Sequence, residues 1–282
     1  MIKIKSMVKA LRPRQWIKNL LVAAAPIAAG QMGLQAKSII LGFIGFTAAS
    51  SFGYLVNDWK DQEADKDHPK KKLRPFASGE LKLNSLFLLL LFCIFVMAAT
   101  CLVLPSKFLL SILVYLAITI SYSLAIKSIP VFEMLWLSTG FLIRAIAGSA
   151  IIQEPPTGWF VVTIGFGALF IVSAKRLAEL KNSYMKVTRS VIKKYNEPFL
   201  NTVLTASLTI TLLTYSLWVF EIHPHSVLAQ FTILPFSLSI FLYAWHCENG
   251  DAESPENLLL SNNLIILTAL ATIFPLLITV YL

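Results

Sequence analysis

Long runs of apolar residues dominate the chain, and short polar segments separate them. A helix rises about 1.5 Å per residue, so about 20 apolar residues cross the roughly 30 Å hydrocarbon core of a bilayer. Backbone polar groups in lipid must be paired within the span, which favours helices. We predict an all-α, polytopic membrane protein with nine transmembrane helices, at about 17–32, 38–56, 83–104, 107–126, 130–152, 158–174, 199–220, 226–247 and 261–282.

The composition agrees with a membrane protein and excludes several other classes. Of 282 residues, 56% are hydrophobic and only 14% are charged, whereas soluble domains carry about 25% charged residues. An ordinary cytosolic enzyme, a disordered chain and a secreted disulfide scaffold are therefore excluded. The net charge of +9 does not indicate nucleic-acid binding, because no basic surface segment is rich in aromatic residues. We predict one catalytic transmembrane domain, 1–282.

The basic residues set the expected orientation. In the nine-helix arrangement, four segments would lie on one face of the membrane, namely 1–18, 57–82, 126–130 and 174–197. All Lys and Arg residues except Lys37, Lys107 and Arg144 lie in these four segments. Lys and Arg accumulate on the cytoplasmic side of membranes. We therefore predict a cytoplasmic N-terminus, a location in the plasma (inner) membrane, and an active site formed by cytoplasmic loops at about 57–82 and 174–197.

Acidic residues gather where the second predicted span ends. On a helix, Asn57, Asp58, Asp61 and Asp65 fall within an arc of about 100°. Three carboxylates beside a membrane would repel one another unless a cation joined them, and Mg²⁺ takes oxygen ligands. The alternative is a solvated, charged helix end. We favour a metal–diphosphate site in which Asn57, Asp58 and Asp61 are catalytic and, with Asp65, hold Mg²⁺.

Cations near this site are candidates to bind phosphate. Arg74 lies in a turn-forming loop with Pro75 and Ser78-Gly79, and it could hold a phosphate against the metal. Lys175, Arg176 and Glu179 repeat the spacing of Asn57, Asp58 and Asp61 four spans later, which suggests a duplicated four-helix unit whose second copy exchanged carboxylates for cations. A cap of positive charge on the cytoplasmic side is the alternative for both segments.

Five further residues are candidates for substrate binding. Arg144 lies inside a predicted span, where an arginine should face a partner or a polar cavity. Glu133 could pair with Arg144 or with Lys127. The other candidates lie where predicted spans meet the cytoplasm and could be there for orientation alone. The five candidates are Lys18, Asn19, Tyr122, Lys127 and Arg144.

The motif from Asn57 to Asp65, the nine spans and the segment Tyr122 to Lys127 resemble the UbiA superfamily of intramembrane prenyltransferases, over nearly the whole chain. Within it, the chain is more similar to the decaprenyl-phosphate 5-phosphoribosyltransferase branch. The segments that carry this similarity are Arg12 to Asn19, Arg74-Pro75, Gly140 to Gly148 and Lys175 to Glu179. Quinone-type members have a second aspartate-rich motif where this chain has Lys175-Arg176-Leu177-Ala178-Glu179, which argues against an allylic diphosphate held between two metal clusters.

The resemblance implies a reaction and its partners. Phosphoribosyl diphosphate would transfer 5-phosphoribose to a polyprenyl phosphate with Mg²⁺, releasing diphosphate, as a first step toward a lipid-linked sugar donor for cell-envelope polysaccharide. A homo-oligomer is possible. Two alternatives stay open: a quinone-type enzyme that joins a polyprenyl diphosphate to an aromatic acceptor, and a transporter without enzymatic activity, whose ionisable residues would lie nearer the middle of the bilayer.

Overall fold

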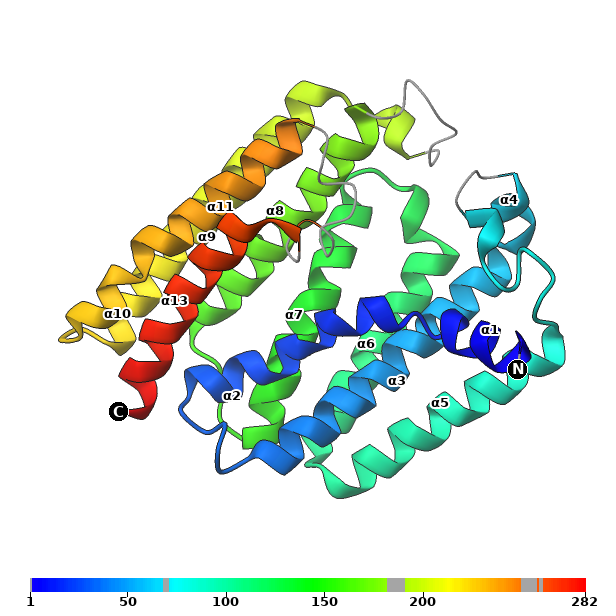
Figure 1. Ribbon diagram of the computed structural model, residues 1–282, viewed down its shortest axis with the longest axis horizontal. Helices are drawn as coiled ribbons and strands as arrows, with labels where there is room; N and C mark the ends of the chain where they lie inside the picture. Colours follow the sequence, from blue (N-terminus) through cyan, green and yellow to red (C-terminus); the bar gives the residue numbers. More distant parts are fainter. Residues whose placement is uncertain (1, 68–70, 182–190, 250–257, 259–260) are drawn as a thin grey trace. The chain divides into compact units, whose positions relative to one another are not determined.

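A computed structural model of the chain describes residues 2–67, 71–181, 191–249, 258 and 261–282. Over these residues it contains helices and connecting turns but no strand (Figure 1). The predicted all-α class is therefore confirmed. Parts of the two predicted active-site loops, 68–70 and 182–190, lie outside the described residues.

Eight helices in the described ranges are long and apolar enough to cross a membrane. One of them, Val227–Glu248, is divided at Thr232 into two segments. The eight are α3 (Ala36–Lys60), α5 (Leu83–Val103), α6 (Ser106–Leu124), α7 (Phe132–Ile152), α8 (Gly158–Lys181), α9 (Glu197–Ile222), α10 with α11 (Val227–Phe231 and Ile233–Glu248) and α13 (Asn263–Tyr281).

The first predicted span, 17–32, does not form one long helix. Its residues belong to a 3-10 helix, η1 (Pro13–Ala23), followed by a short α-helix, α2 (Ala24–Ala28). Gly30 then takes a left-handed backbone conformation with φ 69°, which an α-helix cannot continue through. The expected count of nine spanning helices is therefore approximate. The remaining short elements are α1 (Ile2–Ala10), α4 (Gln62–Lys66), η2 (Lys71–Leu73), η3 (Ile126–Ser128) and η5 (Ile192–Lys194).

The helices form two compact units, each with its own hydrophobic core. The first unit comprises residues 1–26, 31–125 and 143–155, and the second comprises 27–30, 126–142 and 156–282. Helix α7 contributes its first half to the second unit and its second half to the first.

In the first unit, α3 packs against α5, α6 and η1, and its course beside α5 can be followed in Figure 1. The ring of Phe46 on α3 lies 5.7 Å from that of Phe108 and 5.4 Å from that of Tyr115, both on α6. Gly148 on α7 permits close packing on η1, because a Cβ there would collide with the Val22 carbonyl oxygen. The core of this unit thus holds η1 against long helices.

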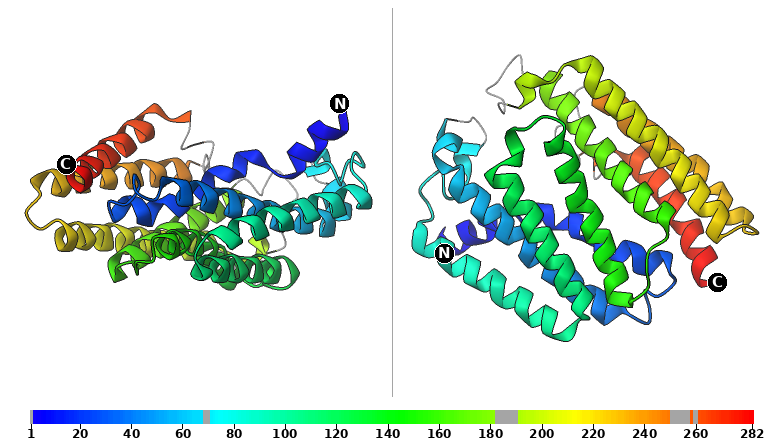
Figure 2. Two further views of the ribbon diagram at one scale, coloured as in Figure 1. Left: turned by 90° about the horizontal axis from the view of Figure 1, so that it is seen from below. Right: turned by 180° about the vertical axis from the view of Figure 1, so that it is seen from behind.

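In the second unit, α8 and α9 make the most extensive helix contact in the described residues, and they run side by side in the right-hand view of Figure 2. Asn196 caps α9 by accepting a 2.8 Å hydrogen bond from the Phe199 N–H, and Pro198 follows in the first turn, where a missing N–H costs nothing. The buried core includes Phe170, Leu177 and Leu200. This core fixes the end of α8, which carries the second charged motif.

Candidate active site

Asp58 lies almost completely buried near the end of α3, with 3% of its surface exposed. The Arg12 guanidinium binds it in a bidentate manner: Nη2 donates to Oδ1 at 2.5 Å and Nε donates to Oδ2 at 3.1 Å. Arg12 also lies over the ring of Tyr54, 4.8 Å from its centroid. Bidentate contacts between an arginine and a carboxylate are among the stronger charge-assisted hydrogen bonds. The carboxylate that the sequence assigns to a metal therefore holds a guanidinium in this structure.

The backbone of Arg12 is strained. Its φ of 56° and ψ of 61° are left-handed, a conformation that costs a residue other than glycine about 1–3 kcal/mol. The segment before it is anchored elsewhere in the first unit, because Lys9 Nζ donates to the Leu73 carbonyl at 2.6 Å and Ser6 donates to Glu80 at 2.5 Å. Arg12 is thus placed at the junction of α1 and η1 so that its side chain reaches α3.

Arg74 connects a second aspartate to the same cluster. Its Nη1 lies 3.1 Å from Asp58 Oδ1 and donates to Asp65 Oδ2 at 2.6 Å. The loop that carries it turns as its sequence predicts: the Ser78 N–H donates to the Arg74 carbonyl at 2.9 Å, and Gly79 has φ 78°. Phe76 in this loop is buried edge-to-face against Trp59 of α3, with ring centroids 5.8 Å apart. The packing of Phe76 against Trp59 therefore positions Arg74 beside Asp58 and Asp65.

Asn57 and Asp61 lie around the break between α3 and α4. Asp61 ends α3 with φ −90° and ψ 4°, so α4 does not continue α3 in strict helical phase. Asp65 still donates its N–H to the Asp61 carbonyl at 2.9 Å. Asp58 and Asp65 share Arg74, but in the described part of the chain no three Asp, Glu, His or Cys side chains gather closely enough to hold a metal ion by themselves. The predicted ligand set stays a prediction.

Arg144 is buried within the first unit in a polar cluster of its own. Its Nε donates to Asn19 Oδ1 at 2.8 Å, and its Nη2 donates to the Tyr115 hydroxyl at 2.7 Å. The amide of Asn19 in turn donates to Thr47 Oγ1 at 3.2 Å and Ser50 Oγ at 3.1 Å. The sequence names Asn19 and Arg144 separately, and the structure brings them into direct contact between η1 and α7.

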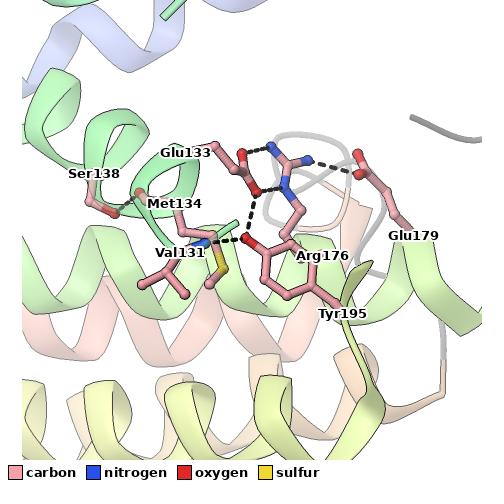
Figure 3. Close-up of polar contacts among 7 residues, drawn as sticks. All are labelled: Val131, Glu133, Met134, Ser138, Arg176, Glu179 and Tyr195. Carbon is pink, nitrogen blue, oxygen red and sulfur yellow. Dashed lines mark hydrogen bonds and ion pairs between the residues drawn. The ribbon is translucent and has the colours of Figure 1, made fainter. Parts of the chain in front are cut away.

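The second charged motif forms a buried network in the second unit (Figure 3). Arg176 on α8 donates from Nε and Nη2 to the two carboxylate oxygens of Glu133 on α7, each at 2.6 Å, and from Nη1 to Glu179 Oε2 at 2.7 Å. Arg176 and Glu133 are essentially inaccessible to solvent. Glu133, which the sequence links to Arg144 or Lys127, binds Arg176. The guanidinium is therefore held by two carboxylates, and the predicted contact of Arg176 and Glu179 with substrate stays a prediction.

Tyr195 completes this network. Its hydroxyl accepts a 2.8 Å hydrogen bond from the Val131 N–H and lies 3.4 Å from Glu133 Oε1. Val131 itself has a left-handed backbone with φ 66°, an uncommon conformation for a β-branched residue. Burial raises the pKa of Tyr195 to about 12, so its hydroxyl is protonated at neutral pH. The turn before α7 is thus tied to the segment before α9.

Four of the residues predicted to bind substrate lie outside the contacts of Asp58, Arg144 and Arg176 described above. Lys18 on η1 donates to Gln15 Oε1 at 2.5 Å. Tyr122 lies near the end of α6, where Lys60 donates to the Ser123 carbonyl at 2.8 Å, and Lys127 follows in η3. Lys175 is half-buried on α8. Their assignment to the substrate remains a prediction.

Sequence reasoning missed Arg12, Tyr115 and Tyr195 as members of these clusters. Arg12 had a signal, because it precedes Pro13 at the point where the first helix must end. Tyr115 is seven residues before Tyr122 and thus on a similar face of the same helix. Tyr195 had no local signal, because it reaches Glu133 from a distant segment across the second unit.

Comparison with known proteins places this chain in a family. The model of the UbiA prenyltransferase family matches residues 19–265. A decaprenyl-phosphate phosphoribosyltransferase of Corynebacterium glutamicum is 34% identical over 288 residues, covering 98% of this chain and 86% of the relative. Its namesake in Mycobacterium tuberculosis is 36% identical over 279 residues, covering 96% and 92%.

Solved structures show the same fold. A UbiA homologue from Archaeoglobus fulgidus, bound to DMAPP and Mg²⁺, superposes with a TM-score of 0.73 at 18% identity, covering 98% of this chain and 99% of that one. A structure of digeranylgeranylglyceryl phosphate synthase superposes with a TM-score of 0.70 at 14% identity, covering 99% of each chain. At such identities the likeness concerns the fold alone. By the family match and by its nearly full-length relatives, the chain belongs to the UbiA prenyltransferase family.

Proposed function

We propose that this chain transfers 5-phosphoribose from phosphoribosyl diphosphate to a polyprenyl phosphate in a reaction that depends on Mg²⁺. The observation that carries the proposal is its identity of 34–36% with proteins named decaprenyl-phosphate phosphoribosyltransferase, over nearly the whole length of both chains. We place the reaction at the cytoplasmic face of the plasma membrane, near the loops 57–82 and 174–197, and expect that copies of the chain can associate.

The second charged motif supports this choice of donor. Arg176 stands at the position that corresponds, by spacing, to Asp58, and its guanidinium is enclosed by Glu133 and Glu179. A buried, neutralised arginine at this position is not a metal ligand. The chain therefore has one aspartate-rich motif able to receive a metal–diphosphate, which fits a phosphorylated sugar donor better than a prenyl diphosphate bound by two metal clusters.

The first motif has donor atoms that fit a divalent cation. Asp58 and Asp65 are buried carboxylates whose oxygens already share one cationic group, Arg74. Asn57, Asp58, Asp61 and Asp65 would hold Mg²⁺, since all four offer oxygen ligands. When bound, Mg²⁺ supplies positive charge that neutralises the leaving diphosphate.

The side chains of the protein would act by position and charge. In the transfer, the bond between ribose C1 and the diphosphate oxygen breaks with its electron pair on diphosphate, and an oxygen of the lipid phosphate forms the new bond to C1. A phosphate is already an anion at neutral pH, so no strong general base is needed. Cations stabilise the phosphate charges of donor and acceptor. The candidates are Lys18, Arg74, Lys127, Arg144, Lys175 and Arg176, with Asn19, Tyr122 and Glu179 as polar contacts.

The test compares two donors on the purified full-length chain with Mg²⁺ and polyprenyl phosphate. One reaction contains radiolabelled phosphoribosyl diphosphate, and the other contains radiolabelled polyprenyl diphosphate with an aromatic acceptor. Label from the first donor should enter the lipid extract as a polyprenyl-phosphoryl 5-phosphoribose. Transfer from the polyprenyl diphosphate alone would replace the proposal with a quinone-type prenyltransferase.

A further inference from the structure

Arg12 contacts Asp58 and donates hydrogen bonds to both of its carboxylate oxygens. We propose that Arg12 is a resident counter-cation: it neutralises Asp58 before substrate binds, and it moves to a phosphate oxygen of the donor when a divalent cation replaces it on Asp58. The inference rests on the proposed function, because it concerns the metal–diphosphate at that site. Metal and diphosphate then bind cooperatively, and Arg12 couples them.

The charges around Asp58 indicate that the metal and the diphosphate bind together. Arg12 and Arg74 contribute two positive charges, and Asp58 and Asp65, both buried, contribute two negative ones. A divalent cation added alone would leave these four groups with an excess charge of +2, or of +1 when the carboxylate of Asp61, the third acidic ligand predicted, is counted. A largely buried site accommodates such an excess poorly. A divalent cation that arrives with a diphosphate brings the compensating anions. The structure therefore disfavours binding of the metal alone.

Differences in exposure show which partner can move. The Arg12 side chain is 24% exposed, whereas the Asp58 side chain to which it binds is 3% exposed. The guanidinium is thus at the edge of the cluster and can leave the carboxylate by rotating about its own side-chain bonds. The nearby ring of Tyr54 offers the cation a second favourable surface. Asp58 stays fixed in α3 while its counter-ion changes.

The backbone conformation of Arg12 supports its proposed role independently of the charges and of the side-chain exposure. Left-handed residues other than glycine persist where the surrounding structure holds them, and they concentrate at functional sites. Arg12 has such a conformation at the start of η1, and η1 is a 3-10 helix of 11 residues, longer than the usual three or four. The exposed Arg14, two residues later in the same segment, provides a matched control that removes the same charge.

The experiment measures metal binding without turnover. Full-length protein in detergent micelles is titrated with Mn²⁺, and free Mn²⁺ is followed by electron paramagnetic resonance, with and without methylenediphosphonate as a stable diphosphate; a titration without protein corrects for the Mn²⁺–diphosphonate complex. Without the diphosphonate, Arg12→Gln should bind Mn²⁺ about tenfold more tightly than the unmodified protein, because a competing charge-assisted hydrogen-bonding partner is gone. With the diphosphonate, the gain in Mn²⁺ affinity should be several-fold smaller in Arg12→Gln. Arg14→Gln should match the unmodified protein in both titrations.

If Arg12 is only a fixed structural contact between η1 and α3, the variants should behave differently. Arg12→Gln would then melt at a lower temperature, but its Mn²⁺ affinity without diphosphonate would not rise and its gain with diphosphonate would not shrink; that pattern overturns the proposal. If Arg12→Gln does not fold, Arg12→Lys takes its place, because lysine keeps the charge but cannot bind both oxygens. It should show smaller changes of the same sign, and values equal to those of the unmodified protein would also overturn the proposal.

The two proposals fail in distinguishable ways. A wrong donor assignment appears in the labelled lipid product and leaves the Mn²⁺ titrations of Arg12→Gln and Arg14→Gln unaffected. A wrong role for Arg12 appears in those titrations while the unmodified chain still forms phosphoribosylated lipid.

Discussion

Arg176 donates hydrogen bonds to both carboxylate oxygens of Glu133, 43 residues earlier in the chain, at 2.6 Å each. Both side chains are buried. Desolvating two charges is costly, so such a pair is weak evidence for net stability, but removing one partner leaves the other charge buried and uncompensated. The pair therefore makes α7 and α8 depend on each other within the second unit.

Glu133→Gln should destabilise the protein by about 3–5 kcal/mol, which thermal and denaturant unfolding in detergent would measure. The exposed pair Glu63–Lys66, at 2.7 Å, is the matched control, and Glu63→Gln should change stability by less than about 1 kcal/mol. Replacing both Glu133 and Arg176 with apolar residues of similar volume should recover part of the loss. Equal, small effects of Glu133→Gln and Glu63→Gln would contradict the importance of burial here.

Gly148→Ala tests the packing of α7 on η1. An added Cβ would collide with the Val22 carbonyl oxygen and would lie 2.8 Å from Pro26 Cδ. Overpacking of this kind costs about 1–3 kcal/mol. At Gly165 the nearest atom to an added Cβ is Leu142 Cδ2, 3.9 Å away, so Gly165→Ala should be nearly neutral. Melting temperatures of the two variants should differ clearly; a tolerated Gly148→Ala would show that η1 can shift.

The hydroxyl of Tyr195 should lose its proton only at high pH. Burial raises its pKa from 10.0 to about 12, so the folded state favours the protonated hydroxyl. Its contribution to stability is therefore complete below pH about 10 and is lost as the pH rises from 10 toward 12. The difference in tyrosinate absorbance between the unmodified protein and Tyr195→Phe should show a midpoint near pH 12 if the protein remains folded. A midpoint near pH 10 would place Tyr195 in open solvent.

Much of the fold follows from local pattern. Apolar runs as long as Leu83–Val103 can satisfy their backbone in lipid only as helices, and that prediction is confirmed. The run at 17–32 differs, because its apolar composition resembles that of a span while its backbone changes from the 3-10 helix η1 to the short helix α2 and turns at Gly30. Composition is thus a good guide to burial in a membrane and a weaker guide to helix continuity.

The candidate site was predictable in residue type but not in pairing. The spacing places Asp58 and Asp65 on one side of a continuous helix and the sequence places Arg74 near the metal site, but nothing local indicates that Arg12 and Arg74 bind these aspartates directly. Arg176 shows the same limit: its place beside Lys175 predicts a cation that binds phosphate, and nothing local indicates that Glu133 from another helix pairs with it. Long-range pairing depends on packing, which a single sequence does not specify.

The measurement that tests the central claim most directly is the fate of two labels on the same donor. Phosphoribosyl diphosphate labelled in its 5-phosphate should deliver label to the polyprenyl lipid, whereas donor labelled in its diphosphate should release all of its label as free diphosphate. Asp58→Ala, inserted in the membrane to the same level, should abolish the transfer. Label from the diphosphate in the lipid, or near-normal transfer by Asp58→Ala, would contradict the account.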